Sequence, residues 1–411
     1  MATGHESDSC GAHGDQCATA AHPAGTLQGV PSASRPFGLY VHVPFCATRC
    51  GYCDFNTYTA GELGSTASPQ SWLQALRLEL ELAAVSSGAP RVDTVFVGGG
   101  TPSLLGADGL TEVLAAVRSS FTLAPGAEVS TESNPESTSR EFFDGIRAVG
   151  YTRVSLGMQS AAAHVLAVLD RTHTPGRAVT AAWQAKAAGF DHVNLDLIYG
   201  TPGETDADLD ASLQAVLDAG VDHVSAYALI VEEGTALARR VRRGELPAPE
   251  DDVLAARYER LDAGLTAAGM HWYEVSNWAR RESAQCRHNL GYWSGGDWWG
   301  AWPGAHSHLD GVRWSNVKQP ARYAADLAAG RSPAADREVL DAAQQHTERV
   351  MLSARLRSGL AVAELGAGEL AVARQRVTDG LLVARGTALV LTDRGRLLAD
   401  GVVRDILVAG D

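Results

Sequence analysis

One phrase recurs along the middle of this chain and limits what it can fold into. An Ala-rich helix tail, a Gly and a strand-like apolar run follow one another, at residues 148–156, 187–195, 218–226 and 267–275. Each Gly suits the left-handed position at which a helix ends, and the residues after it are typical of a buried strand. Helices that alternate with buried strands predict a parallel sheet.

Further strands and helices extend the alternation on both sides. The strands are expected at 37–43, 92–97 and 127–131, and the helices at 71–84, 139–149, 175–188, 206–219 and 250–268. Six or seven such units that curve round predict an α/β fold, a full or partial (β/α) barrel of the TIM type. A doubly wound open sheet is the alternative, although no G-x-G-x-x-G turn opens a helix here. In a barrel, ligands bind at the C-terminal ends of the strands.

Three thiols follow the strand 37–43 in a short loop, at Cys46, Cys50 and Cys53. A structural zinc site normally uses four ligands, and no fourth thiol is nearby. An iron–sulfur cube also takes thiolate ligands, and a cube held by three of them keeps one iron open for a ligand. The tight spacing, with Tyr52 and Phe55 beside it, favours a cluster over zinc or a loop of reduced cysteines.

Composition narrows the compartment and the partners. The 411 residues carry a formal net charge of −14, so no nucleic-acid partner is expected. No apolar stretch reaches the length of a membrane span, and no signal peptide is visible. Three of the six cysteines are clustered, which fits a reducing compartment better than a disulfide framework. The sequence therefore predicts a cytoplasmic location.

Polar residues stand where the predicted strands end. Glu132 follows the strand 127–131, Gln159 and Arg171 follow the next strand, and Asp196 lies on the one after it. The turn G-G-G-T at 98–101 lets backbone approach a neighbour closely, because glycine has no Cβ. A buried acid needs a partner. Each residue alone has an equally good structural explanation, but their common position at the barrel mouth predicts one shared ligand.

The motif C-x3-C-x2-C, with an aromatic residue before its last Cys, resembles that of the radical S-adenosylmethionine (SAM) superfamily. The resemblance implies a [4Fe-4S] cluster on Cys46, Cys50 and Cys53, with its open iron bound to the amino and carboxylate groups of SAM. It also implies that an electron from the cluster can split SAM into methionine and a 5′-deoxyadenosyl radical.

Other motifs narrow the resemblance to the oxygen-independent coproporphyrinogen oxidase group, over residues 36–411. They are G-G-G-T-P-S, E-x-N-P, S-L-G-M-Q-S, L-I-Y-G-x-P-G, Y-E-V-S-N and C-R-H-N-L-G-Y-W. Matched position by position, the group's pattern implies that eight residues surround SAM: Tyr40, Gly99, Gly100, Thr101, Glu132, Gln159, Arg171 and Asp196. No residue is assigned a catalytic role beyond cofactor binding.

Two sequence features separate the decarboxylating enzymes of that group from its heme chaperones, and in both this chain resembles the chaperones. The decarboxylating enzymes have a further Cys where Phe55 stands, and H-N-x-x-Y-W at 288–293 is typical of the chaperones. The resemblance implies that the chain binds heme and passes it to acceptor proteins, with membrane-associated respiratory proteins among the candidates, and that a donor reduces the cluster. Two alternatives stay open: oxidative decarboxylation of coproporphyrinogen III, and radical SAM chemistry on another substrate.

Seven of the nine tryptophans lie between residues 272 and 314. They indicate either a packed cap or a wall for a large flat ligand such as a porphyrin. His288, in the same stretch, is the expected axial ligand of heme iron, and Cys286 is the second candidate. Trp302 replaces a Gly that is usual in the similar family turn, which puts the pose of heme in doubt.

Four regions are expected along the chain. Residues 1–35 predict a disordered tail, whose metal- or heme-binding residue types are His5, Cys10, His13, Cys17 and His22. An incidental, solvated tail is the simpler interpretation. Residues 36–270 predict the barrel core, and 271–336 a Trp-rich segment that closes it around heme. Residues 337–411 predict a winged-helix-like module, with a helix at 338–356, a hairpin at 381–392 and a further helix capped by Thr392 or Asp393.

Overall fold

The computed structural model describes residues 35–63 and 68–410. The predicted tail lies outside the described residues, except for its last position. The largest element is a twelve-stranded sheet, with the order β14-β13-β12-β11-β1-β4-β5-β6-β7-β8-β10-β9. Its six central strands are parallel: β1 (Phe37–Val43), β4 (Val92–Gly99), β5 (Leu123–Ser133), β6 (Arg153–Gln159), β7 (His192–Tyr199) and β8 (His223–Ala228). This arrangement confirms the α/β fold with a partial barrel.

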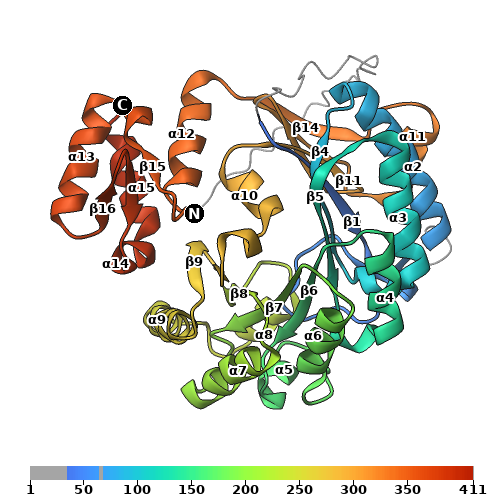
Figure 1. Ribbon diagram of the computed structural model, residues 1–411, viewed down its shortest axis with the longest axis horizontal. Coiled ribbons are helices and arrows are strands. Elements are labelled where there is room, and N and C mark those ends of the chain that lie inside the picture. The colour runs from blue at the N-terminus through green and yellow to red at the C-terminus, as the bar shows by residue number, and fades with distance from the viewer. Residues whose placement is uncertain (1–34, 64–67, 411) are drawn as a thin grey trace, which may run out of the picture.

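Helices cover the outer, convex face of the curved sheet (Figure 1). They are α2 (Pro69–Ser87), α3 (Gly106–Ser120), α4 (Arg140–Val149), α6 (Arg177–Ala187), α7 (Asp206–Ala219) and α9 (Asp251–Ala267). Leu76 and Leu80 show how they pack, since helical spacing puts both on the face of α2 that is fully buried. Gly150 and Gly220 end two of these helices with φ of 115° and 60°, as the repeated phrase predicts.

The segment predicted to close the barrel extends both edges of the sheet. At one edge, β10 (Asn277–Ala279) runs antiparallel to β8, and β9 (His271–Glu274) runs antiparallel to β10 as the last strand. At the other, β11 (Asp297–Ala301) lies parallel to β1 and leads into β12 (His306–Leu309), β13 (Val312–Asn316) and β14 (Ala334–Val339). The tryptophans are therefore divided between two edges that are far apart in the sheet order, and they do not form one wall.

Most of these tryptophans belong to the packed core. Trp299 and Trp302 are 1% and 2% exposed, and both contact the buried carboxylate of Glu79 on α2. That carboxylate also accepts hydrogen bonds from Asn316 and Tyr323. Trp302 has a φ of 109°, in a region of backbone conformation that favours glycine. A bulky residue in this turn fills the gap between the sheet edge and α2.

Short elements complete the barrel and its ends: β2 (Phe45–Cys46), β3 (Tyr58–Thr59), α1 (Ala60–Leu63), α5 (Ala163–Val168), α8 (Ala236–Arg242), α10 (Arg287–Trp293) and α11 (Pro320–Ala328). Helix α10 lies on the concave side of the sheet (Figure 1) and contacts β4 and β1. Among the helices of the described ranges, none is both long enough and apolar enough to cross a membrane.

The C-terminal part has a hydrophobic core of its own, from Val350 to Ile406. It contains α12 (Ala342–Ser353), β15 (Leu360–Ala361), α13 (Ala367–Thr378), the hairpin β16 (Leu382–Arg385) and β17 (Ala388–Leu391), α14 (Asp393–Leu397) and α15 (Ala399–Val408). Thr392 caps α14 as expected. The predicted helix 338–356 begins only at Ala342, because Glu338 and Val339 pair with β13 and Asp341 supplies the helix cap.

Candidate functional site

The parallel strands enclose a cavity of about 430 Å³ inside the partial barrel. We use two names for its ends. The mouth consists of the thiol loop 46–55 and the C-terminal ends of the strands, including Glu132, Gln159 and Asp196. The floor lies at the N-terminal ends and consists of Glu128, Arg153, His223 and Cys286, with His288 beside them. Because side chains alternate along a strand, every second residue of β6, β7 and β8 lines the cavity between floor and mouth.

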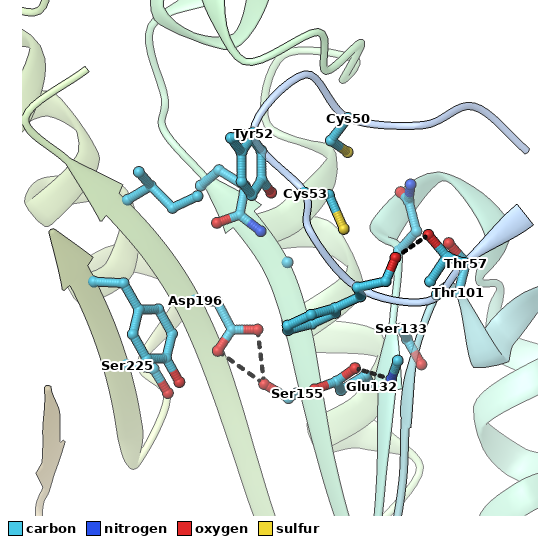
Figure 2. Close-up of a pocket in the computed structure, with 18 of the residues that line it drawn as sticks. Cys50, Tyr52, Cys53, Thr57, Thr101, Glu132, Ser133, Ser155, Asp196 and Ser225 are labelled. Atoms are coloured by element: carbon cyan, nitrogen blue, oxygen red, sulfur yellow. Dashed lines mark hydrogen bonds between the residues drawn. The ribbon is translucent and has the colours of Figure 1, made fainter. Parts of the chain in front are cut away.

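The three cysteines line the mouth, and Figure 2 shows Cys50 and Cys53 on the thiol loop. Cys46 ends the short strand β2, while Cys50 and Cys53 share a turn in which the Cys53 N–H donates to the Cys50 carbonyl over 3.2 Å. The carbonyl oxygen of Gly51, the residue after Cys50, accepts a 2.8 Å hydrogen bond from the Leu237 N–H at the start of α8. The loop is therefore fastened to the barrel on the side opposite β1.

The electrostatics of this loop suit ligands that lose their protons on binding metal. Burial raises the pKa of Cys46 and of Cys53, so an added positive charge is needed to hold both as thiolates. The Arg171 guanidinium lies 3.5 Å from the Cys50 sulfur. Within residues 35–63 and 68–410, no three His, Cys, Asp or Glu side chains stand in ligating geometry. The three thiols thus line the same cavity but are not close enough together to ligate one metal ion. Their all-sulfur donor set fits an iron–sulfur cluster.

The glycine turn after β4 fastens the thiol loop to the barrel. A Cβ on Gly100 would meet the Phe45 carbonyl oxygen at 2.6 Å and the Cys46 sulfur at 3.0 Å. The Thr101 N–H donates to that same Phe45 carbonyl over 2.8 Å. Gly99 has a φ of 110°. Any larger residue at Gly100 would displace Cys46, so the turn positions a predicted cluster ligand as well as lining the cavity.

Two carboxyl groups face the cavity from β5 and β7, the strands on either side of β6. Glu132 accepts a 2.9 Å hydrogen bond from the Gly99 N–H, and Asp196 accepts from Ser155 Oγ and Asn194 Nδ2 (Figure 2). Burial, reinforced by repulsion from Asp196, raises the pKa of Glu132 to about 8. Burial also raises the pKa of Asp196, to about 6. A ligand that brings a cation or hydroxyl donors to this pair would stabilise their charged forms.

The remaining predicted SAM residues differ in position. Gln159 ends β6 with a φ of 68° and lines the cavity. Arg171 lines it too, and its Nη2 donates to the Gly157 carbonyl over 3.1 Å. Tyr40 is not a lining residue of this cavity, and its hydroxyl lies 3.0 Å from His42 Nδ1. The structure thus brings together every residue predicted for the cluster and SAM except Tyr40.

A polar layer across the middle of the cavity was missed from the sequence. Ser155, Asn194 and Ser225 occupy the same place in three copies of the repeated phrase, and all three point inward. The Asn194 amide donates to Ser155 Oγ over 2.6 Å and to Ser225 Oγ over 3.0 Å. The signal was available, because V-S-L, V-N-L and V-S-A each place a polar residue between two apolar ones.

The floor is closed by a buried ion pair. Arg153 Nε donates to a Glu128 oxygen over 3.0 Å, and Arg153 Nη2 donates to the carbonyls of Ala284 and Gln285. Burial alone would raise the pKa of Glu128, but the guanidinium outweighs it and the pKa is lowered. Cys286 lies beside this pair, and burial raises its pKa to about 12, which keeps the thiol protonated.

His288 is buried beneath the floor and is 3% exposed. Its Nδ1 lies 2.8 Å from Thr94 Oγ1 and its Nε2 lies 2.7 Å from the Tyr292 hydroxyl, while its ring stacks on Phe96. Burial lowers its pKa to about 4, so the imidazole is neutral. The adjoining hollow measures only about 20 Å³. Ligation of heme iron by His288 stays a prediction, and this geometry disfavours it because neither ring nitrogen is free.

Comparisons with known proteins agree with the geometry. The model of the radical SAM superfamily matches residues 40–216, from β1 to α7. The heme chaperone HemW of Mycobacterium tuberculosis is 64% identical over 377 residues, which cover 92% of this chain and 96% of that protein. The heme chaperone HemW of Bacillus subtilis is 31% identical and covers 88% and 97% of the two chains.

A solved structure shares the fold. The coproporphyrinogen III oxidase HemN of Escherichia coli superposes with a TM-score of 0.79 over 94% of this chain and 92% of its own, at 23% identity. Because 94% of this chain is covered, the likeness extends into the C-terminal module. The sequence matches are more specific than this shared fold, and by them the chain belongs to the HemW family of the radical SAM superfamily.

Proposed function

We propose that this protein is a heme chaperone that binds heme and delivers it to heme-accepting proteins. The observation that carries the proposal is the 64% identity to the Mycobacterium tuberculosis heme chaperone across nearly the full length of both chains. Phe55 supports it from the thiol loop, since the decarboxylating enzymes that the sequence resembles have a further thiol at this position.

The mouth of the cavity is the proposed site for a [4Fe-4S] cluster and SAM. Cys46, Cys50 and Cys53 would hold the cluster, which together with SAM supplies one-electron chemistry when bound. Arg171 offsets the negative charge that builds up on the thiolates, because its guanidinium already lies against Cys50. An electron donor is part of this proposal, since the cluster must be reduced before it can act.

The two carboxyl groups of the mouth would hold SAM in place. Glu132 and Asp196 would accept hydrogen bonds from the amino group and the ribose hydroxyls of SAM. These donors would lower the free-energy cost of holding charged carboxylates away from water, a cost that raises the pKa of both groups. Gly99 and Gly100 have no side chains, so a ligand can approach their backbone closely. Asn194 fixes the Asp196 carboxylate through a 2.6 Å hydrogen bond.

Heme transfer and porphyrin product analysis together test the proposal. The anaerobically reconstituted protein is loaded with heme and mixed with an apo-hemoprotein, and the Soret absorbance of each is measured after they are separated. In parallel, coproporphyrinogen III is incubated with protein, SAM and a reductant, and its products are separated by chromatography. We expect heme to appear on the acceptor and the coproporphyrinogen to remain intact. Decarboxylated products, or no heme binding at all, would overturn the proposed function.

A further inference from the structure

We infer that heme docks on an apolar rim at the cavity mouth, formed by Phe55, Tyr227 and Ile230. This placement rests on the proposed function and adds a location to it. It differs from the expectation that heme binds at His288 against a wall of tryptophans. The position predicted from the sequence is closed, whereas the mouth exposes apolar side chains and carries charges that suit a dicarboxylate.

The floor leaves no space for a porphyrin. The hollow beside His288 measures about 20 Å³, which is too small for a porphyrin. The tryptophans expected to face heme are instead packed, with Trp299 and Trp302 against the α2 side of the sheet. A heme at His288 would have to break two buried hydrogen bonds and reopen packed core.

The mouth exposes large apolar side chains that contribute little to the core. Ile230 is 64% exposed, Phe55 53% and Tyr227 43%, and all three line the same cavity. Tyr52 and Leu229 add to the same wall. Exposed apolar surface is unfavourable in water, and an apolar ligand that covers it lowers the free energy. Exposed apolar side chains beside a cavity commonly mark a binding site.

The charges of the rim favour an apolar ligand that carries carboxylates. Arg49 lies on the thiol loop with 46% of its side chain exposed, and its nearest carboxylate, on Glu62, is 3.9 Å away. It lines the cavity together with Arg171. The acidic lining residues nearest the rim are Asp54 and Glu232. We therefore place the two heme propionates on the side of Arg49, a half-exposed cation whose guanidinium lies 3.4 Å from the Phe55 carbonyl oxygen and 3.9 Å from the Glu62 carboxylate.

The decisive experiment is a heme titration of the cluster-loaded protein, followed by its Soret band, with one charged substitution at the rim. In Ile230→Asp, a carboxylate replaces an apolar contact and repels the propionates, so we expect the affinity for heme to fall about tenfold or more. The matched control is Val339→Asp, at an equally exposed β-branched residue on β14 (65% against 64%), and it should bind like the wild type.

A second variant keeps the inference testable if Ile230→Asp folds poorly. Arg49→Gln removes the rim cation from an exposed side chain and should weaken heme binding several-fold. Thermal melting of each variant shows whether the fold is kept. Wild-type heme affinity in a folded Ile230→Asp or in Arg49→Gln would overturn the placement at the mouth. Heme that fails to bind the wild-type protein would instead overturn the proposed function.

Discussion

The mouth and the floor of the barrel are built from the same strands but treat charge in opposite ways. Glu128 is buried, and Glu132, four residues further along β5, is half-buried at the cavity wall. At the floor, Arg153 pairs with Glu128 and the pKa of this carboxyl is lowered. At the mouth, Glu132 has one backbone donor and a neighbouring acid, and its pKa is raised to about 8.

The difference shows which buried polar groups belong to the fold and which await a ligand. A buried polar group whose hydrogen bonds are all made inside the protein stabilises the fold. A buried polar group that lacks partners lowers the stability, and a ligand that supplies those partners offsets this cost. The thiols follow the same division. Cys286 is enclosed at the floor, whereas Cys46, Cys50 and Cys53 are partly exposed at the mouth.

The largest expected effect separates a thiol of the mouth from the thiol of the floor. Cys53→Ala should abolish the [4Fe-4S] cluster, because three thiolates are the fewest that can hold it here. Cys286→Ala should keep the cluster, because that thiol is buried and protonated at the other end of the cavity. Iron and sulfide counts after anaerobic reconstitution measure both. A full cluster in Cys53→Ala would show that other ligands hold it.

The second effect concerns stability and the ion pair of the floor. Arg153→Met leaves Glu128 as an uncompensated buried charge and should lower the free energy of unfolding by about 3–5 kcal/mol. Glu132→Gln at the mouth should not destabilise the ligand-free protein near pH 7, because the neutral carboxyl is already favoured there. Urea unfolding compares the two variants. An equal loss in both would erase the distinction between floor and mouth.

The third effect tests whether the mouth binds SAM. Asp196→Ala removes a buried acceptor that faces the cavity, and affinity for SAM should fall on the order of a hundredfold. Asp210→Ala, at a surface aspartate paired with Arg260, is the control and should change nothing. Calorimetry on cluster-loaded protein gives both affinities. Unchanged affinity in Asp196→Ala would move SAM away from this wall.

The last effect is a dependence of stability on pH. Glu132 has an ordinary pKa of about 4.5 when unfolded and about 8 when folded, so the folded protein binds the extra proton between these values. Its contribution to stability is therefore present below pH ~4.5 and is lost as the pH rises towards ~8. The melting temperature of ligand-free Glu132→Gln should fall less over this range than that of the wild type. Identical pH profiles would show that Glu132 is already ionised.

The sequence predicts the barrel well because the signals are local. The Gly stops and apolar runs set each helix and strand, and β1 (Phe37–Val43) and α7 (Asp206–Ala219) have the predicted bounds. Because ligands bind at the C-terminal ends of barrel strands, the polar residues at the predicted strand ends could be selected from the sequence, and nearly all of them lie at the mouth. Helix 338–356 was predicted too long because strand pairing with β13, a non-local interaction, takes its first residues.

The floor and the tryptophans show what sequence reasoning cannot supply. Aromatic residues close together in the chain look like one wall, but the sheet order sends Trp278 to one edge and Trp299 to the other. His288 in a family motif looks like a ligand, but only three-dimensional packing shows both its nitrogens occupied. Pairing across the barrel decides whether a polar residue is structural, and a single sequence does not contain that information.

Heme titrations of Ile230→Asp and His288→Ala, carried out side by side on cluster-loaded protein, test most directly where the ligand binds. If the mouth is the binding end, Ile230→Asp loses about tenfold or more in affinity, whereas His288→Ala stays within about twofold of the wild type and keeps its Soret spectrum. The opposite order, with a shifted Soret band and weak binding in a folded His288→Ala and wild-type binding in Ile230→Asp, would contradict it and assign heme to the floor.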